Sequence, residues 1–398
     1  MKWVCCQIGA RENYAVARAL DRHGMLECLL TDVWLHPDSP LGKVNRRLAE
    51  RFNKELARST ICAANLRAIG FELRASLLAL DGWSQITARN QWFQKRVVSK
   101  LSRMRRAETP HTIFAFSYAA RDIFRWARGQ GWRTVLGQID AGPPEERIVA
   151  GLYAQEPGVR GRWQEAPPQY WAEWREECAL ADRIVVNSLW SQRALEEEGV
   201  SSGKIRVIPL GYEGSADAVK FQREYPSTFT RSRPLRVLFL GTVCLRKGIG
   251  PLLDAIRLLR GLPIEFWFVG AMDVRIPADL RDDPQVRWVG PIRRSETGKF
   301  YRDADVLVFP TFSDGFGLTQ LEAQAWRLPI IATDFCGRVV EHGHNGWLLK
   351  EVTGGAIADA IGKGLAEPRR LQNLASNAVQ SEQFGLTAIG KQWLDIFE

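Results

Sequence analysis

Residues 306–322, VLVFPTFSDGFGLTQLE, decide the fold of this chain. The apolar run at 306–309 predicts a buried strand, which is followed by a turn and then by a helix entered through Gly315 and Gly317. Glycines at a helix start let an anion approach the free backbone N–H groups, where the helix dipole is positive. The stretch therefore predicts a strand–turn–helix unit whose helix start can bind an anion.

Two carboxylates bracket this helix start. Asp314 stands just before the helix, and Glu322 lies eight positions later, inside it. A carboxylate at each edge of a phosphate cradle suits a ligand with hydroxyl groups on both sides of its phosphates. A nucleotide-sugar has that form, with a ribose at one end and a hexose at the other. The alternative is an ordinary strand–turn–helix unit that binds nothing.

The same residues resemble the E-x7-E signature of the retaining glycosyltransferases of family 4. The family pattern EGFGLxxLEAMA stands here as DGFGLTQLEAQA, with Asp314 where the family usually has Glu. The continuation LPIIATDFCGRVVEHGHNGWLL and the segment ECALADRIVVNSLWSQRALEEEGVSSGKIRVIPLGY are also similar to the family. The resemblance is strong over residues 172–346 and only general before residue 108. It implies an α/β fold of two Rossmann-like domains that face each other across a cleft, the GT-B architecture.

A second segment, LRVLFLGTVCLRKGIGPLLDAIRLL, has the same implication. It predicts a strand that ends at Gly241, a loop with Arg246 and Lys247, and an amphipathic helix. Ligands of open α/β sheets bind at the carboxyl ends of the strands, where these two cations fall. Taken alone, two basic residues after a strand are usually surface residues; beside the carboxylate pair they indicate a phosphate site. The family frequently has Arg directly after the glycine, where this chain has Thr242, so Arg246 is expected to supply that charge.

The charges and the resemblance together imply roles for these residues. Arg246, Lys247 and the amides at the helix start would stabilise the departing nucleoside diphosphate electrostatically. Asp314 would hold hydroxyls of the transferred sugar, and Glu322 those of the ribose. The resemblance implies a retaining mechanism, a UDP- or GDP-linked donor as co-substrate, no covalent nucleophile and no metal or other cofactor. The expected donor-binding residues are Gly9, Ala10, Gly241, Thr242, Arg246, Lys247, Pro291, Ile292, Asp314, Gly315, Phe316, Gly317, Leu318 and Glu322, and the expected catalytic ones are Asp314, Arg246, Lys247 and Asp140.

In the first half of the chain, the residues expected at the site differ from those usual in the family. Gly9 and Ala10 follow the first strand at its carboxyl end, where family members often have two glycines. Many members carry a His after the strand that matches RTVLGQI, but this chain has Gln138, Ile139 and Asp140 there. Asp140 or Gln138 is therefore expected to take over a positioning role.

An apparent metal motif lies just before the first quoted strand. Asp303-Ala304-Asp305 has the D-x-D form that metal-dependent glycosyltransferases use. Because it precedes the strand at 306–309, it falls at the end of the sheet opposite the ligand crevice. A helix terminus and a strand entry are expected there, without a divalent cation.

Composition and alternation predict the domain organisation. A length of 398 residues with 45% apolar residues fits two or three domains with full cores. Strand patterns alternate with helical ones, which implies parallel sheets covered on both faces. The expected strands are 3–8, 111–117, 133–139, 182–188 and 205–208 in the first half, and 237–240, 264–269, 286–289, 305–309, 329–333 and 347–349 in the second. The expected units are an acceptor-binding domain (1–210), a connection (211–234), a nucleotide-sugar-binding domain (235–383) and a last helix (384–398) that, by resemblance, crosses back to the first domain.

Cysteine usage and hydropathy bear on the compartment. Seven cysteines, an odd number without a C-x-x-C pair, argue against a disulfide framework or a zinc site. No apolar run approaches the roughly 18–20 residues of a membrane span, and the first strand is followed at once by a charged helix rather than by a cleavage site. A cytoplasmic location is expected, with peripheral contact to the inner face of the cell membrane as a variant.

Positive charge is concentrated in residues 41–108. This segment has fifteen Lys and Arg against five Asp and Glu, while the whole chain carries +9. The helix predicted over 87–106 sets an apolar stripe against basic residues, namely Phe93, Val97, Leu101 and Met104 against Lys95, Arg96, Lys100, Arg103 and Arg106. Such a helix either packs in its domain with a solvated basic face, lies on an anionic membrane, or binds an anionic glycan or nucleic acid. No nucleic-acid-binding module is recognisable, so no nucleic-acid partner is expected.

Three classes of function follow. A glycosyltransferase that moves a hexosyl group to a glycan, a lipid-linked glycan or a similar acceptor, in the synthesis of cell-surface polysaccharide or glycoconjugates, is favoured. A Rossmann oxidoreductase is disfavoured because WVCCQIGARENYA has one glycine of the G-x-G-x-x-G fingerprint. A non-catalytic membrane- or glycan-binding scaffold of the same fold is the alternative, and hydrolysis of a donor would discriminate against it.

Overall fold

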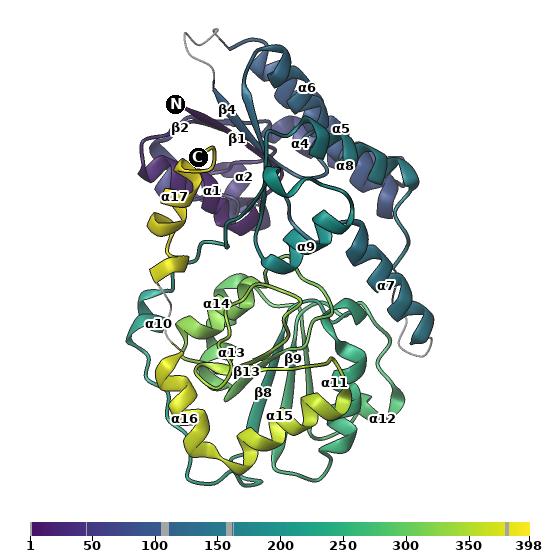
Figure 1. Cartoon of the computed structure of the whole chain (residues 1–398), viewed down its shortest axis with the longest axis vertical. Helices are drawn as coiled ribbons and strands as arrows, with labels where there is room; N and C mark the ends of the chain where they lie inside the picture. Colours follow the sequence, from purple (N-terminus) through teal and green to yellow (C-terminus); the bar gives the residue numbers. More distant parts are fainter. Residues whose placement is uncertain (1, 45, 105–110, 157–160, 162, 379–381) are drawn as a thin grey trace.

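Two parallel β-sheets, one in each half of the chain, form the frame of the molecule (Figure 1). The computed structural model describes residues 2–398 except 45, 105–110, 157–160, 162 and 379–381. Every strand pair in both sheets is parallel, and helices cover the faces. The predicted fold class, two Rossmann-like α/β domains, is confirmed.

The first sheet has seven strands in the order β3-β2-β1-β4-β5-β6-β7. Its strands are β1 (Trp3–Gln7), β2 (Leu26–Thr31), β3 (Ile61–Ala63), β4 (Thr112–Phe116), β5 (Arg133–Gly137), β6 (Arg183–Val186) and β7 (Ile205–Val207). Its helices are α1 (Ala15–Arg22), α2 (Pro40–Val44), α3 (Arg46–Ala49), α4 (Asn65–Leu77), α5 (Gly82–Leu101), α6 (Arg121–Gly129), α7 (Pro143–Gln155), α8 (Pro168–Leu180) and α9 (Leu189–Glu197).

The second sheet has six strands in the order β10-β9-β8-β11-β12-β13. Its strands are β8 (Leu235–Leu240), β9 (Ile264–Val269), β10 (Val286–Gly290), β11 (Val306–Phe309), β12 (Ile330–Ala332) and β13 (Gly346–Leu348). The helices from the connection onward are α10 (Ala216–Lys220), α11 (Ile249–Leu258), α12 (Ala278–Arg281), α13 (Thr297–Asp303), α14 (Leu318–Ala325), α15 (Gly354–Ala366), α16 (Pro368–Asn377) and α17 (Leu386–Leu394).

The strand order of each sheet reverses at one point, between β1 and β4 in the first and between β8 and β11 in the second. Successive crossovers leave in opposite directions there, and a crevice opens at the carboxyl ends of the two strands. The quoted stretch 306–322 begins at β11, and the loop with Arg246 and Lys247 follows β8. The predicted phosphate site therefore lies at the switch point of the second sheet.

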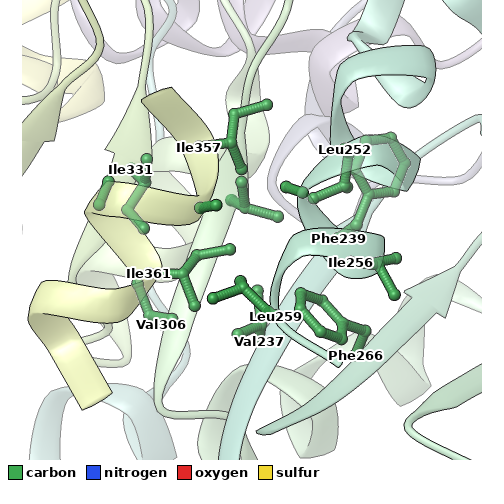
Figure 2. Close-up of a cluster of buried hydrophobic side chains, with 14 of the residues drawn as sticks. Val237, Phe239, Leu252, Ile256, Leu259, Phe266, Val306, Ile331, Ile357 and Ile361 are labelled. Atoms are coloured by element: carbon green, nitrogen blue, oxygen red, sulfur yellow. The ribbon is translucent and has the colours of Figure 1, made fainter. Parts of the chain in front are cut away.

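The core of the second domain explains why its strands were predictable (Figure 2). Side chains from β8, β9, β11 and β12 pack against α11 and α15, so apolar residues recur at the strand period and at the helix period. Residues labelled in this cluster are Val237, Phe239, Leu252, Ile256, Leu259, Phe266, Val306, Ile331, Ile357 and Ile361. This packing anchors the carboxyl ends of β8 and β11.

Two strands of the first sheet, β2 and β3, were not among the predicted segments. β2 begins with the half-buried Leu26 and the exposed Glu27 and is buried only from Cys28 onward. β3 is a three-residue edge strand whose side chains are half-buried or exposed. β3 has too few buried side chains to show a pattern, whereas β2 has an apolar run (Cys28, Leu29 and Leu30) comparable to those of the predicted strands.

The last helix, α17, lies against α1 in the first domain, where the yellow end of the chain meets its purple start (Figure 1). Its residues Ile389 and Trp393 are buried in one cluster with Trp3 of β1. The Trp3 and Trp393 rings stand edge to face with centroids 6.0 Å apart. The first sheet is thus completed by the last residues of the chain.

Helix α5 contains most of the basic helix predicted over 87–106. Phe93, Val97 and Leu101 of its apolar stripe are buried in the core of the first domain. Lys95, Lys100 and Arg103 are exposed, whereas Arg105 and Arg106 lie outside the described residues. The membrane orientation considered for this stripe is wrong, because the domain core already covers it. Among the described residues, no helix is long and apolar enough to cross a bilayer.

An arginine of the predicted connection ties it to the second domain. The guanidinium of Arg223 is buried and donates to backbone carbonyls in the last turn of α13 and just after the ends of α13 and α14. The accepting oxygens are those of Tyr301 (2.6 Å), Arg302 (3.2 Å), Ala304, Trp326 (2.9 Å) and Arg327 (3.0 Å). The last carbonyls of a helix lack partners within it, and the planar fork of Arg suits them. Arg223 therefore fixes the helix that carries Glu322.

Candidate active site

The turn from β11 to α14 contains glycines where the backbone passes close to other groups. Gly317 has φ of 83°, and a Cβ there would lie 2.5 Å from the Phe309 ring. A Cβ on Gly315 would lie 2.3 Å from the carbonyl oxygen of Ile139, which belongs to the first domain. Only glycine fits at either position. The helix start predicted to bind an anion therefore touches the first domain.

Arg246 and Lys247 lie on a short 3₁₀ turn, η4 (Leu245–Lys247), at the carboxyl end of β8. Arg246 donates from Nη1 to the carbonyl oxygen of Ser313 at 2.6 Å, and the same nitrogen is 3.7 Å from Oδ2 of Asp314. Lys247 forms an ion pair with Asp314. The structure thus brings together the two predicted cations and the predicted catalytic carboxylate, although they are far apart in the sequence.

The environment of Lys247 is poor in water. Burial, with a further contribution from the neighbouring Arg246 charge, lowers the pKa of Lys247 to about 7. Its ammonium also lies 4.8 Å from the centre of the Phe309 ring. In the structure Asp314 compensates this ammonium, and an anionic ligand that reached it would also bind strongly, because little water competes for the charge.

Glu145 connects the first domain to these cations and was not predicted. It lies in the first turn of α7 and accepts from the hydroxyl of Ser313 at 2.7 Å. Its other oxygen lies 3.4 Å from Nε of Arg246. Burial raises the pKa of Glu145, and the Arg246 charge opposes that shift. The Glu145 carboxylate of the first domain therefore lies against the Arg246 guanidinium of the second domain, where the phosphate is expected to bind.

A cavity of about 390 Å³ opens beside this contact and is lined by both domains. Thr242, Cys244, Arg246 and Asp273 come from the second domain. The first domain contributes three carboxylates and a group of aromatic rings, among its residues Trp83, Tyr118, Asp140, Gly142, Glu145, Glu146, Val149, Tyr153, Trp163, Tyr170 and Trp171. Aromatic faces with interspersed carboxylates are suited to sugar rings, which present C–H faces and hydroxyl edges.

Asp140 lines this cavity and is held by three donors. Its Oδ1 accepts from the Tyr118 hydroxyl (2.5 Å), the Gln138 amide (3.0 Å) and the Gly142 N–H (2.9 Å). Gln138 is buried, and its Oε1 accepts from Nε1 of Trp174 at 2.9 Å. Of the two residues considered as replacements for the family's His, Asp140 therefore faces the cavity, while Gln138 orients it from behind.

Glu322 lies about one turn into α14, away from the Lys247–Asp314 pair. Its Oε2 accepts from the Tyr301 hydroxyl at 2.6 Å. Burial raises the pKa of Glu322, opposed by that hydrogen bond and by the Arg294 charge. The two predicted carboxylates thus have separate partners, and their division between the ribose and the hexose stays a prediction.

The other predicted donor residues lie at carboxyl ends of strands. Gly9 and Ala10 follow β1; Gly9 has φ of 71°, and its N–H donates to Asp32 at 2.8 Å. Gly241 and Thr242 follow β8, with Gly241 at φ of 140°. Pro291 and Ile292 follow β10; Pro291 is exposed, and Ile292 packs partly against the domain core. Their contact with a donor stays a prediction.

The D-x-D carboxylates have separate structural partners. Asp305 is buried; Arg233 donates to both of its oxygens at 2.7 Å, and the Arg236 N–H donates to Oδ2 at 2.9 Å. Asp303 is exposed and pairs with its neighbour Arg302 at 2.8 Å. Their positions at the amino end of β11 support the structural role predicted for them.

Further contacts between the domains were missed with Glu145. Nε1 of Trp190 donates to the Ser313 hydroxyl at 3.0 Å, and the Ser191 hydroxyl donates to the Gly315 carbonyl at 3.5 Å. Both residues lie in the first turn of α9, next to its cap Ser188. The sequence signal is only that of a normal helix start, so it could not identify partners in the other domain.

Residues 234–367 match the family model described as Glycosyl transferases group 1. This range contains both cations, both carboxylates and the glycine turn described above. The C-terminal domain belongs to the group 1 glycosyl transferases.

Relatives of this group 1 glycosyl transferase domain differ in what their names state. The D-inositol 3-phosphate glycosyltransferase 2 of Catenulispora acidiphila is 34% identical over 115 residues, which is 28% of this chain and 27% of that protein. The capsular polysaccharide biosynthesis glycosyltransferase CapM of Staphylococcus aureus is 24% identical over 50% of this chain and 56% of its own. The amylovoran biosynthesis glycosyltransferase AmsK of Erwinia amylovora is 26% identical over 44% and 45%. The chain thus spans between about a quarter and about half of these relatives.

Solved structures match over almost the whole chain. Anabaena Alr3699/HepE in complex with UDP-glucose superimposes with a TM-score of 0.63 at 16% identity, covering 99% of both chains. The sucrose-phosphate synthase of Thermosynechococcus elongatus gives a TM-score of 0.61 at 20% identity, covering 100% and 98%. At these identities the match shows a shared fold, including the arrangement of its two sheets.

Proposed function

We propose that this chain is a retaining glycosyltransferase that moves a hexosyl group from a UDP- or GDP-linked sugar to a glycan or lipid-linked glycan. Cell-surface polysaccharide or glycoconjugate synthesis is the proposed setting, since CapM and AmsK carry polysaccharide biosynthesis in their names. One observation carries the proposal. Arg246, Lys247 and Asp314 converge at the switch point of the second sheet, beside a cavity that both domains line.

The proposed chemistry is electrostatic. As the glycosidic bond to the diphosphate breaks, negative charge grows on the leaving oxygen, and the two cations with the amides at the start of α14 stabilise it. Asp314, which pairs with Lys247 in the structure, would orient hydroxyls of the transferred hexose beside these cations. The acceptor hydroxyl attacks from the leaving-group side, and the departing phosphate takes its proton, so the anomeric configuration is retained. Asp140, fixed by three donors, positions the reacting groups from the first domain.

Donor binding would rearrange the contact between the domains. Diphosphate oxygens and the Glu145 carboxylate compete for the same guanidinium, that of Arg246. Glu145 is held on its other side by the Ser313 hydroxyl. In the proposed cycle the phosphate replaces Glu145 on Arg246. The released carboxylate remains in the wall of the cavity that both domains line, and in this proposal that cavity receives the acceptor.

The function is tested with a thermal-shift panel of UDP-, GDP- and ADP-sugars, followed by hydrolysis of the best stabiliser without acceptor. UDP-glucose is the first choice, because Anabaena Alr3699/HepE was solved with it. Stabilisation by one donor with slow release of its nucleoside diphosphate supports the proposal. Stabilisation without hydrolysis or transfer would favour the non-catalytic scaffold.

Metal independence gives a separate expectation. Because Asp305 is occupied by Arg233 and the cations at the site neutralise the phosphates, donor hydrolysis should persist in EDTA at close to its untreated rate. The measurement is the initial rate with and without chelator. A rate abolished by EDTA and restored by Mn²⁺ or Mg²⁺ would overturn this assignment.

Calorimetry of the bare nucleoside diphosphate separates the two carboxylates. Glu322→Gln should weaken its binding roughly 10- to 100-fold, because a charged acceptor for the ribose hydroxyls becomes a neutral amide. Asp314→Asn should leave that affinity nearly intact and lower turnover with the full sugar donor, because its expected contacts are with the hexose. Equal losses of affinity in both variants would show that the carboxylates do not divide the donor between them.

A further inference from the structure

Helix α4 is apolar on two opposite faces, and the described part of the chain covers one of them. Ala68 and Ala75 are buried against the domain, and Phe71 stacks on Trp92 of α5 with centroids 5.3 Å apart. The opposite face carries leucines that are mostly exposed: Leu66 (74% exposed), Leu73 (62%), Leu77 (87%) and, just after the helix, Leu78 (59%). Spacings of seven and four residues place Leu66, Leu73 and Leu77 in one stripe.

The charges beside this leucine face are positive. Arg67 and Arg74 follow Leu66 and Leu73 by one position each, so they border the stripe along one side, and both are exposed. The single acid of the helix, Glu72, is bound by Arg89 of α5 through two hydrogen bonds of 2.9 Å. The surrounding segment 41–108 carries a surplus of ten positive charges. The partner of this face should therefore be apolar and negatively charged at its edge.

The leucine face is also adjacent in the chain to the proposed acceptor cavity. Leu77 ends the helix and Leu78 follows it, and Trp83, at the start of α5, lines the cavity. The Trp83 ring packs on Tyr170 with centroids 4.7 Å apart, and its Nε1 donates to the Gln164 carbonyl at 3.0 Å. A partner bound to these leucines would therefore lie near the side of the cavity that the first domain forms.

We propose that the leucine face of α4 (Leu66, Leu73, Leu77 and Leu78, bordered by Arg67 and Arg74) docks on the surface of a bilayer containing anionic lipid. The leucines enter the boundary between headgroups and acyl chains, and the arginines contact the anionic headgroups. The contact is peripheral. It deepens the proposed function by selecting a lipid-linked acceptor, whose sugar enters the cavity past Trp83 while its lipid stays in the bilayer.

Vesicle flotation of the full chain tests the docking without any sugar transfer. The wild type should float with vesicles of phosphatidylcholine and phosphatidylglycerol, and less with phosphatidylcholine alone or in high salt. Leu73→Glu combined with Leu77→Glu should reduce partitioning on the order of tenfold or more. Arg67→Glu combined with Arg74→Glu should remove the preference for anionic vesicles.

The matched control is Val219→Glu combined with Leu258→Glu. These side chains are 67% and 65% exposed and lie elsewhere on the surface, so this variant should float as the wild type does.

Three further measurements make the result decisive. Unchanged melting temperatures exclude misfolding, since all these side chains are exposed. Donor hydrolysis in vesicle-free solution should be equal in the wild type and the leucine variant; absence of hydrolysis in both would refute the proposed function and leave the flotation result standing. Flotation of the leucine variant equal to the wild type overturns the docking proposal. So does a dimer in light scattering that the leucine variant abolishes while neither protein floats, because the face would then bind a second copy.

Discussion

Replacing either Lys247 or Arg246 by alanine should reduce turnover on the order of 10²–10³-fold, because each removes a preorganised charge aimed at the leaving diphosphate. The structure strengthens this expectation for Lys247, which burial and Arg246 have brought to a pKa of about 7. Such an ammonium is poorly hydrated, so an anion compensates it more strongly than it would a surface lysine. Initial rates of donor hydrolysis and of transfer measure the effect.

Lys220→Ala, at an exposed lysine of α10, is the matched control and should have wild-type rates. Lys247→Met preserves much of the side-chain volume and should behave as the alanine variant does, which separates the loss of charge from the loss of packing. Near-normal turnover in both single alanine variants would remove these cations from the mechanism.

Arg223→Ala should lower the free energy of unfolding of the second domain by about 3–4 kcal/mol, the second large effect expected here. The substitution leaves several carbonyls at the C-terminal ends of α13 and α14 without this donor. Urea denaturation followed by far-UV circular dichroism, fitted as two transitions because there are two domains, measures the loss.

Two variants delimit the role of Arg223. Arg223→Lys should recover only part of the stability, because an ammonium cannot reach carbonyls on two helices with a planar fork. Arg231→Ala, at an exposed arginine of the same connection, should change the free energy of unfolding by less than about 0.5 kcal/mol. A stable Arg223→Ala protein would mean that water replaces the guanidinium at little cost.

The second domain was predictable from sequence because its local patterns and its core agree. Strands such as β8 and β11 are short apolar runs ending in turn residues, and Gly317 marks the helix start that follows β11. The proximity of Lys247 and Asp314 was also predictable. Both were expected at carboxyl ends of strands, and such ends meet at one edge of a parallel sheet.

The contacts between the domains could not be predicted from the sequence in the same way. Glu145 follows two prolines in the first turn of α7, where an acid is favoured by the helix dipole whatever else it contacts. Nothing near it in the sequence indicates Arg246 or Ser313 as partners. The leucine face of α4 was not predicted for a related reason. The amphipathic pattern of α5 is stronger in the sequence, and only the fold shows that its apolar residues Phe93, Val97 and Leu101 are buried.

The place of α17 has a consequence for how this protein is made. Trp3 of β1 is covered by Trp393 of α17, which leaves the ribosome only after the whole second domain. During translation one apolar face of the first sheet therefore stays exposed to solvent until α17 is synthesised. By then the whole second domain has emerged and can already have folded. Domains usually fold in the order of synthesis. Here the first domain is completed only after the second, so nascent chains stalled before residue 386 should depend most on chaperones.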